Sequence, residues 1–81
     1  MTEITEAVRE FILKEFLPGE DPENLLDNTP LISGGILDSL ATIKLVTFIE
    51  ERYGVSVEPH ERDEDSIGTV SNIVQLIDSK L

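Results

Sequence analysis

Apolar side chains recur at helical spacing in the first part of the chain. Five of them stand at positions i, i+4, i+7, i+8 and i+12, and so share one face of an α-helix: Ile4, Val8, Phe11, Ile12 and Phe16. The pair Pro18-Gly19 follows, and such a pair ends helices. The pattern predicts a helix over residues 3–17 with its apolar stripe turned toward a core.

Two further stretches show the same spacing. Residues 39–53 are predicted to be a helix whose buried stripe consists of Thr42, Leu45, Val46, Ile49 and Tyr53. Residues 70–80 are predicted to be a helix whose stripe consists of Val70, Ile73, Val74, Ile77 and Leu81. Asp38 or Ser39 is suited to cap the first of these helices, and Thr69 the second.

Residues 18–38 have the composition of a loop, with three prolines and three glycines. This segment is longer than the roughly 12–15 residues usual for structureless connections, which indicates an ordered functional loop or a missed element. A single helical turn fits Glu23 to Asp27. Six apolar residues are expected to hold the loop on the core: Leu25, Leu26, Leu31, Ile32, Ile36 and Leu37.

Between the second and third long helices the pattern is weaker. Val55-Ser56-Val57 alternates like a strand, but no partner strand is predicted, so we expect an extended connector. Pro59 to Asp65 is polar and is predicted to contain one short helix. Ser66-Ile67-Gly68 is then expected to turn the chain, with Ile67 inserted in the core.

These elements predict an all-α fold. Three main helices and one short helix form a small four-helix bundle, with a long loop between helices one and two. At 81 residues, the chain has the length of one domain, and we expect residues 1–81 to form it. A domain of this size buries only about 60–65% of its unfolded surface, so its core is thin.

The charge balance narrows the class of partner. Seventeen acidic and six basic residues give a net charge of −11, which disfavours nucleic acid and anionic membranes and favours partners with basic surfaces. Cysteine is absent, so disulfides and thiolate metal sites are excluded. His60 lies in a polar stretch, and the nearby acidic cluster lacks the spacing of a calcium loop, so we expect no metal site. Without a long apolar run, we expect a cytoplasmic monomer.

The hexapeptide Gly35-Ile36-Leu37-Asp38-Ser39-Leu40 places a serine where the long loop becomes the second helix. One interpretation is that Ser39 only caps that helix. Asp38 is an equally good cap, however, which makes a second capping residue redundant. Gly34-Gly35 also gives the loop freedom to present the turn to another protein.

This hexapeptide resembles the attachment motif of the phosphopantetheine-dependent acyl carrier protein family. The order of helices is similar too, as are the run Leu45-Val46 through Tyr53-Gly54 and the segment Ile67-Gly68-Thr69-Val70. The resemblance implies that Ser39 carries phosphopantetheine, within a motif completed by Asp38 and Leu40. It implies a stand-alone, non-catalytic carrier that shuttles acyl groups as thioesters, which suits a chain without its own thiol.

The implied partners are a phosphopantetheinyl transferase, an acyl- or aminoacyl-loading ligase and downstream pathway enzymes. Asp38 is expected to help dock the transferase. Ala41, Lys44 and Arg52 stand where fatty-acid carriers are often acidic, and Gly34-Gly35 resembles aminoacyl and peptidyl carriers, including the D-alanyl type. The cargo is therefore either an acyl group of a specialised pathway or an amino acid.

Two further sets of residues are candidates for contacts with partner and cargo. We expect a partner face on the second helix formed by Leu40, Ile43, Lys44, Thr47 and Glu51. A cleft that could shelter an acyl chain is expected between this helix and residues 55–67, lined by Val46, Ile49, Val57 and Ile67. Ordinary core packing is the alternative for Leu40 and Ile43 in the first set and for all four residues of the second.

Two other classes of function agree less well with the sequence. A serine hydrolase is disfavoured because Gly-x-Ser-x-Gly is absent around Ser39 and His60 has no orienting acid that the sequence specifies. An acidic helical interaction module without a cofactor agrees with the charge, but it leaves the Asp38-Ser39-Leu40 placement unexplained.

Overall fold

The computed structural model describes residues 2–81, with side chains from Glu3 onward. It contains the α-helices α1 (Thr2–Phe16), α2 (Ser39–Tyr53), α3 (Glu64–Ile67) and α4 (Val70–Lys80). Two 3₁₀ turns, η1 (Pro22–Asn24) and η2 (Pro59–Glu61), lie in the connections. No strand occurs among the described residues, and the predicted small bundle of three main helices and one short helix is confirmed.

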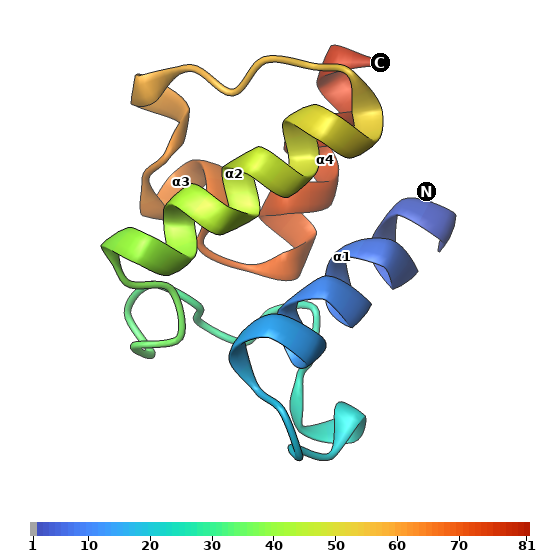
Figure 1. Cartoon of the computed structure of the whole chain (residues 1–81), viewed down its shortest axis with the longest axis vertical. Helices are drawn as coiled ribbons and strands as arrows, with labels where there is room; N and C mark the ends of the chain where they lie inside the picture. The colour runs from blue at the N-terminus through green and yellow to red at the C-terminus, as the bar shows by residue number, and fades with distance from the viewer. Residues whose placement is uncertain (1) are drawn as a thin grey trace.

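The helices α1 and α2 run in opposite directions on the same side of the molecule, and α4 passes behind α2 (Figure 1). Both α1 and α3 pack against α4. Contact between α1 and α2 is made through aromatic rings, because Phe11 stacks on Phe48 with ring centroids 4.2 Å apart. The two ends of the described chain lie at the same end of the bundle (Figure 1).

The core is aliphatic and draws on every α-helix. The three predicted stripes supply most of it, and their fully or almost fully buried members are Val8, Ile12, Leu45, Val46, Ile49, Val70, Ile73, Val74 and Ile77. Thr42 and Tyr53 are only half-buried at the edges of the α2 stripe. Leu81 is 68% exposed, because it follows the end of α4 and no element covers it.

The long loop is ordered, as predicted, and is held by hydrogen bonds to two helices. The Arg9 side chain in α1 donates to the carbonyl oxygens of Pro22 and Leu25. The Ser71 N–H at the start of α4 donates to the Asp27 carbonyl at 3.0 Å. These contacts press the loop against the bundle, where Leu25 is buried.

Two expectations for this loop are corrected. Leu26 does not anchor it but is 58% exposed, because Leu26 and Thr29 close a tight turn through two hydrogen bonds and Leu25 takes the core position. The helical turn expected at Glu23 to Asp27 is instead the 3₁₀ turn η1, which begins at Pro22 and is capped by the Asp21 carboxylate.

The short helix lies later than predicted. The segment from Pro59 to Asp65 is divided between η2 and the start of α3, which extends to Ile67. The Asp63 side chain accepts the Ser66 N–H at 3.0 Å, and this cap starts a new turn at Glu64. Ile67 is fully buried, as expected, but it lies in the last turn of α3 and not in a separate turn.

Candidate functional site

The chain that leads into α2 is fixed by the backbone of Leu31. Its N–H donates to the Gly68 carbonyl at 2.8 Å, and its carbonyl accepts the N–H groups of Ile36 and Leu37, each at 2.9 Å. Leu31 and Leu37 are both buried. The loop is therefore closed into a compact turn that starts and ends in the core, and α2 begins two residues after it.

The Gly34-Gly35 pair is a geometric requirement of this turn. A Cβ atom at Gly34 would lie 2.3 Å from the Pro30 carbonyl oxygen, which is closer than non-bonded atoms approach. Gly35 has a φ of +83°, a conformation that side chains with a Cβ rarely adopt. The pair thus shapes the turn, whereas the sequence alone indicated only that it adds freedom.

Asp38 is the cap of α2, and its carboxylate accepts the Ala41 N–H at 2.8 Å. Ser39 is the first residue of the helix and is exposed. Among the described residues, none forms a hydrogen bond with the Ser39 hydroxyl. Capping is therefore done by Asp38, and the serine is free for another role.

The surroundings of Ser39 fit a phosphate ester. In the described hydrogen bonds, the N–H groups of Ser39 and Leu40 have no acceptor, and they lie at the positive end of the α2 dipole. A helix N-terminus with unpaired N–H groups stabilises a phosphate. The neighbouring Asp38 carboxylate opposes a second negative charge, but its oxygen is engaged by Ala41.

The residues predicted as a partner face all lie on the exposed surface of α2. Leu40 is 63% and Ile43 56% exposed, and both are unusually exposed for large aliphatic side chains. Lys44, Thr47 and Glu51 are exposed beside them. The Thr47 hydroxyl donates to the Ile43 carbonyl at 2.9 Å, so it is oriented along the helix.

The residues predicted to line an acyl cleft lie in the packed core. Val46, Ile49, Val57 and Ile67 belong to one buried cluster, and the most exposed of them is 4% accessible. The Val57 N–H is additionally held by the Glu50 carboxylate at 2.8 Å. In this conformation the four side chains contact the protein interior, and none of the surface hollows described below is lined by them.

An open groove instead follows the line between α1 and α2. A hollow of about 240 Å³ next to Ser39 is lined by Phe16, Ile36, Asp38, Leu40, Ala41 and Lys44. A second, of about 350 Å³, is lined by Phe11, Glu15, Ile43, Lys44, Thr47, Phe48 and Glu51. A third, of about 150 Å³, adds Ala7, Glu10, Lys14 and Arg52. We call these three hollows together the α1–α2 seam.

The sequence did not predict the seam. The sequence predicts that Phe11 and Phe16 belong to the buried stripe of the first helix and that Ile36 anchors the loop. Each is only partly buried and presents a face to the seam. The feature of the sequence that could have indicated the seam is the size of the phenylalanine side chains. Large rings on two adjacent helices increase the distance between the helix axes and leave space beside the rings.

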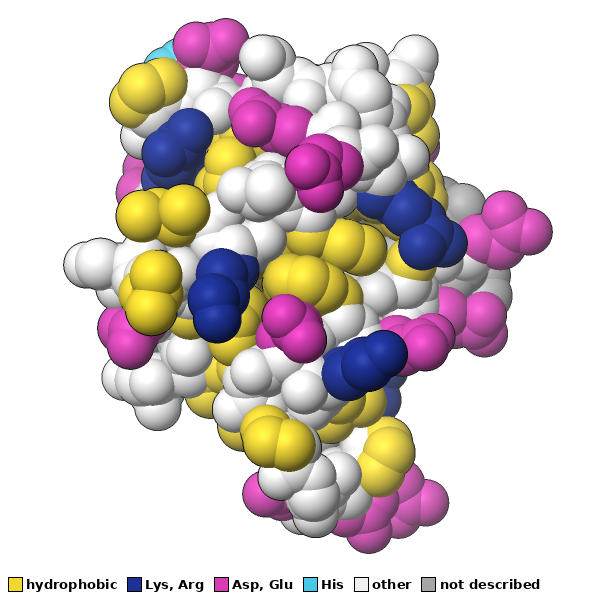
Figure 2. Space-filling view, viewed as in Figure 1, with side chains coloured by type: hydrophobic (Ala, Val, Ile, Leu, Met, Phe, Trp, Pro, Cys, Tyr) yellow, Lys and Arg dark blue, Asp and Glu magenta, His cyan; other side chains and the backbone are white. Residues whose placement is uncertain are grey.

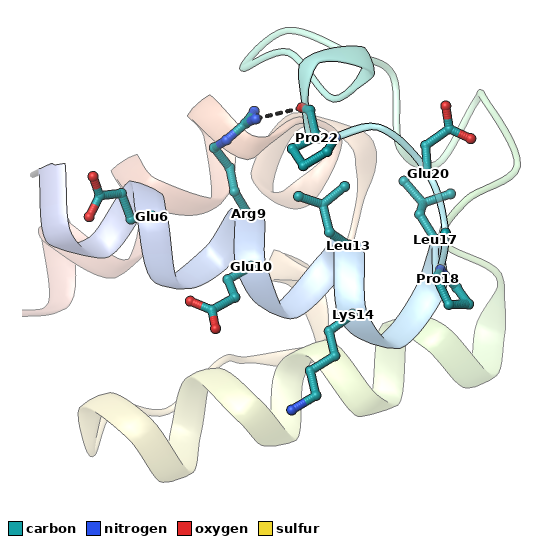
Figure 3. A pocket seen from close by; sticks show the side chains of 10 residues that line it. Glu6, Arg9, Glu10, Leu13, Lys14, Leu17, Pro18, Glu20 and Pro22 are labelled. Atoms are coloured by element: carbon teal, nitrogen blue, oxygen red, sulfur yellow. Dashed lines mark hydrogen bonds between the residues drawn. The ribbon is translucent and has the colours of Figure 1, made fainter.

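Another shallow hollow, of about 590 Å³, lies over α1 and the turn that follows it (Figure 3). Leu13, Leu17 and Pro22 form its apolar part, and Arg9 reaches across to the Pro22 carbonyl at 2.8 Å. Neither Ser39 nor either of its neighbours lines this hollow. It is therefore separate from the α2 N-terminus.

The polar segment near His60 supports α4. His60 is exposed, and Glu61 pairs with Lys80 at 2.8 Å. Within the described part of the chain, no group of His, Cys, Asp or Glu side chains is arranged to hold a metal ion. No helix there is long and apolar enough to cross a membrane.

A small all-α bundle, a long ordered loop and an unpaired serine at the start of the second long helix are the arrangement of a helical carrier domain. Residues 5–77 match the family described as the phosphopantetheine attachment site. The chain therefore belongs to the phosphopantetheine-attachment carrier family, and its prosthetic group is phosphopantetheine. This agrees with the resemblance seen in the sequence. It also argues against the alternative of an interaction module without a cofactor.

Similar proteins include D-alanyl carrier proteins of Streptococcus pyogenes. Those of serotype M1 and of serotype M49 (strain NZ131) are each 35% identical over 72 residues, which cover 89% of this chain and 87% of theirs. One chain of the crystal structure of an FAD-dependent dehydrogenase is 36% identical, with a TM-score of 0.78. That match covers 86% of the present chain and 97% of the solved one, so the solved chain is itself small.

Proposed function

We propose that Ser39 carries the phosphopantetheine arm and that residues 1–81 act as one carrier domain in the cytoplasm, where coenzyme A can donate the arm. The chain performs no catalysis of its own and presents a thioester to other enzymes. The observation that carries this proposal is the exposed Ser39 hydroxyl, free of hydrogen bonds beside two unpaired N–H groups. A tether of this kind raises the effective concentration of its cargo near each partner.

The test is intact mass after incubation with coenzyme A and a broad-specificity phosphopantetheinyl transferase. The wild-type protein should gain one phosphopantetheinyl group, and Ser39→Ala should gain none. Ser33→Ala is the matched control, because Ser33 is an exposed serine of the loop that leads into α2. Modification of Ser39→Ala, or no modification of the wild type, would refute the assignment.

We further propose that the cargo is an acyl group carried as a thioester and, within that class, an amino acid. The similarity to D-alanyl carrier proteins over most of both chains supports the aminoacyl cargo. Loading of the holo protein by amino-acid-activating and fatty-acid-activating ligases, each with ATP, separates the two cargoes by mass. If only fatty-acid-activating ligases load the protein, the aminoacyl assignment is wrong and the cargo is an ordinary fatty acyl group.

The exposed α2 residues Leu40, Ile43, Lys44, Thr47 and Glu51 are proposed as the docking face for these enzymes. The exposure of two large aliphatic side chains beside charged ones supports this, because such patches commonly bind partners. Lys44→Glu should change the kinetics with at least one cognate enzyme and leave the helical content unchanged. Unchanged kinetics with every loading and downstream enzyme would reject Lys44 as a docking residue.

A flavin-dependent dehydrogenase is a second partner class that one observation favours. A small chain in the crystal structure of an FAD-dependent dehydrogenase superposes on this one at 36% identity. We infer that a dehydrogenase of this type oxidises the tethered group and transfers two hydrogens to its flavin. Loss of two hydrogens from the loaded arm, measured by mass on incubation with such an enzyme, is the expected result.

A further inference from the structure

We propose that the α1–α2 seam is the resting site of the phosphopantetheine arm and its aminoacyl group between visits to partner enzymes. This inference rests on the attachment of the arm to Ser39 proposed above. Figure 2 shows hydrophobic side chains along the middle of the face that carries α2 and α1, with acidic and basic side chains set among them.

The seam starts beside the attachment point. Asp38 and Leu40, the two neighbours of Ser39, both line its first hollow. Lys44 lines the first and second hollows, and Phe11 and Phe48 line the second and third. The hollows therefore follow one another along α2 without an intervening element, and a group attached at Ser39 can enter at one end.

The length of the arm matches the seam. Thr47 lies eight residues beyond Ser39, a distance of about 12 Å along a helix axis. An extended phosphopantetheine chain has the reach of roughly four extended peptide residues, about 14 Å. The terminal thioester can thus lie over the second hollow while the phosphate stays at the α2 N-terminus.

The chemistry of the seam suits the arm. Its apolar side is formed by Phe11, Phe16, Ile36, Leu40, Ile43 and Phe48, which can cover the geminal methyl groups of the pantoyl unit. The Lys44 ammonium can donate to the carbonyl oxygens of the arm. Phe11 and Phe48 are stacked with an interplanar angle of 14°, and both rings line the second hollow.

The far part of the seam suits an amino acid. Glu15 and Glu51 place a carboxylate on each side of the second hollow, from α1 and α2 respectively. An aminoacyl thioester keeps a free ammonium group, which these carboxylates attract, and its small side chain would face the phenylalanine rings. A simple fatty acyl group has no ammonium group to pair with Glu15 or Glu51, so these two carboxylates favour the aminoacyl class.

The resting site overlaps the proposed docking face. All five residues of the docking face also line the seam: Leu40, Ile43, Lys44, Thr47 and Glu51. An enzyme that docks on α2 therefore covers the seam and displaces the arm toward its own active site. Storage and release are thereby controlled by the same surface.

The test uses isotope-labelled protein to which unlabelled phosphopantetheine or alanyl-phosphopantetheine is transferred from coenzyme A or alanyl-coenzyme A. Intact mass of the wild type and of Ser39→Ala first establishes that the arm is on Ser39, so a failure of attachment is distinguished from a failure of sheltering. Isotope-filtered nuclear Overhauser contacts are expected between the geminal methyl groups and the ring of Phe16 in the first hollow, and between the methylene groups next to the thiol and the ring of Phe48 in the second. Shift changes confined to Asp38–Leu40, or found at Val57 and Ile67, would overturn the proposal.

Alkylation of the arm thiol by iodoacetamide is an independent readout. It should be about threefold slower than that of free pantetheine if two thirds of the arms lie in the seam. Ile43→Ser should bring the rate back toward that of pantetheine, and Leu26→Ser should not. These two variants are matched, because Ile43 is 56% and Leu26 58% exposed and neither supports the core.

Glu51→Gln separates the cargo from the arm. It should reduce the shift changes at Phe11 and Phe48 caused by alanyl loading, and leave those caused by the unloaded arm unchanged. Equal effects on both forms would show that the carboxylates do not recognise the ammonium group. An alkylation rate equal to that of pantetheine in the wild type would contradict the resting site itself.

Discussion

At the scale of single residues, Asp38 and Ser39 divide two tasks between them. Asp38 closes the N-terminus of α2 with its side chain, and Ser39 is left exposed with its hydroxyl unbonded. Because the cap is supplied by the preceding residue, substitution of Ser39 is expected to leave the helix intact. Loss of function in Ser39→Ala can therefore be separated from loss of structure.

Asp38→Ala is expected to lower the free energy of unfolding by about 1 kcal/mol, because the Ala41 N–H loses its acceptor. Asp38→Asn keeps an oxygen that can accept the Ala41 N–H, so only the favourable interaction of the negative charge with the helix dipole is lost. This should lower the free energy of unfolding by about 0.3 kcal/mol, the lower end of the range for one charge at a helix terminus. Urea denaturation measures both. If Asn is as costly as Ala, the contribution of Asp38 is electrostatic and not a hydrogen-bonded cap.

At the scale of elements, η2 is joined to the end of α4 by one carboxylate. Glu61 accepts the Glu58 N–H at 2.9 Å and pairs with the Lys80 ammonium at 2.8 Å. The hydrogen bond from Lys80, followed by that from Glu58, holds the pKa of Glu61 below its usual value of 4.5. The link fastens the polar connector, which carries no buried residue in η2, to the last turn of the bundle.

A carboxyl group whose pKa is lowered on folding stabilises the fold above its unfolded pKa. That contribution is lost as the pH falls through the lower folded pKa. Glu61→Gln should therefore have a lower Tm than the wild type at about pH 6, and the difference should shrink toward about pH 3. Glu6→Gln, at an exposed position of α1, is the control. A difference that is independent of pH would contradict the role of the Glu61 charge.

At the scale of the whole molecule, a net charge of −11 is confined to a body of 30 × 26 × 19 Å. Three of the six basic side chains, Lys14, Lys44 and Arg52, line the α1–α2 seam. The rest of the surface is correspondingly more acidic. The seam therefore differs from its surroundings in charge as well as in apolar character.

This crowding of negative charge predicts that salt stabilises the protein. In 10 mM salt the Debye length is about 30 Å, which equals the longest dimension of the molecule, so the negative charges repel one another across the whole surface. In 150 mM salt the Debye length is about 8 Å, and most of this repulsion is screened. The Tm should rise over this range, and to the same extent with sodium and choline chloride. A rise with sodium alone would indicate a specific cation site, and no rise would show that the repulsion is negligible.

Much of the fold could be predicted from the sequence, because helix caps and apolar spacing depend on residues that are close together in the chain. The limits of α2 and α4 match the prediction, since Asp38 and Thr69 cap helices with their own side chains and apolar spacing marks the faces. The place of Ser39 at a helix start follows from the same local signals. The later position of α3 was not predicted, because the acidic segment from Pro59 to Asp65 offers more than one capping side chain, and only the structure shows that Asp63 is the one used.

Residue order could not distinguish which apolar side chains close the core and which leave space on its surface. Leu25 and Leu26 are adjacent and identical, yet one is buried and the other exposed. Phe11 and Phe16 carry the pattern of core residues, but the Phe11 ring stacks on Phe48 of α2 and is only partly buried, and the seam is left open beside these rings. Such spaces arise from packing between elements distant in sequence, so local periodicity carries no record of them.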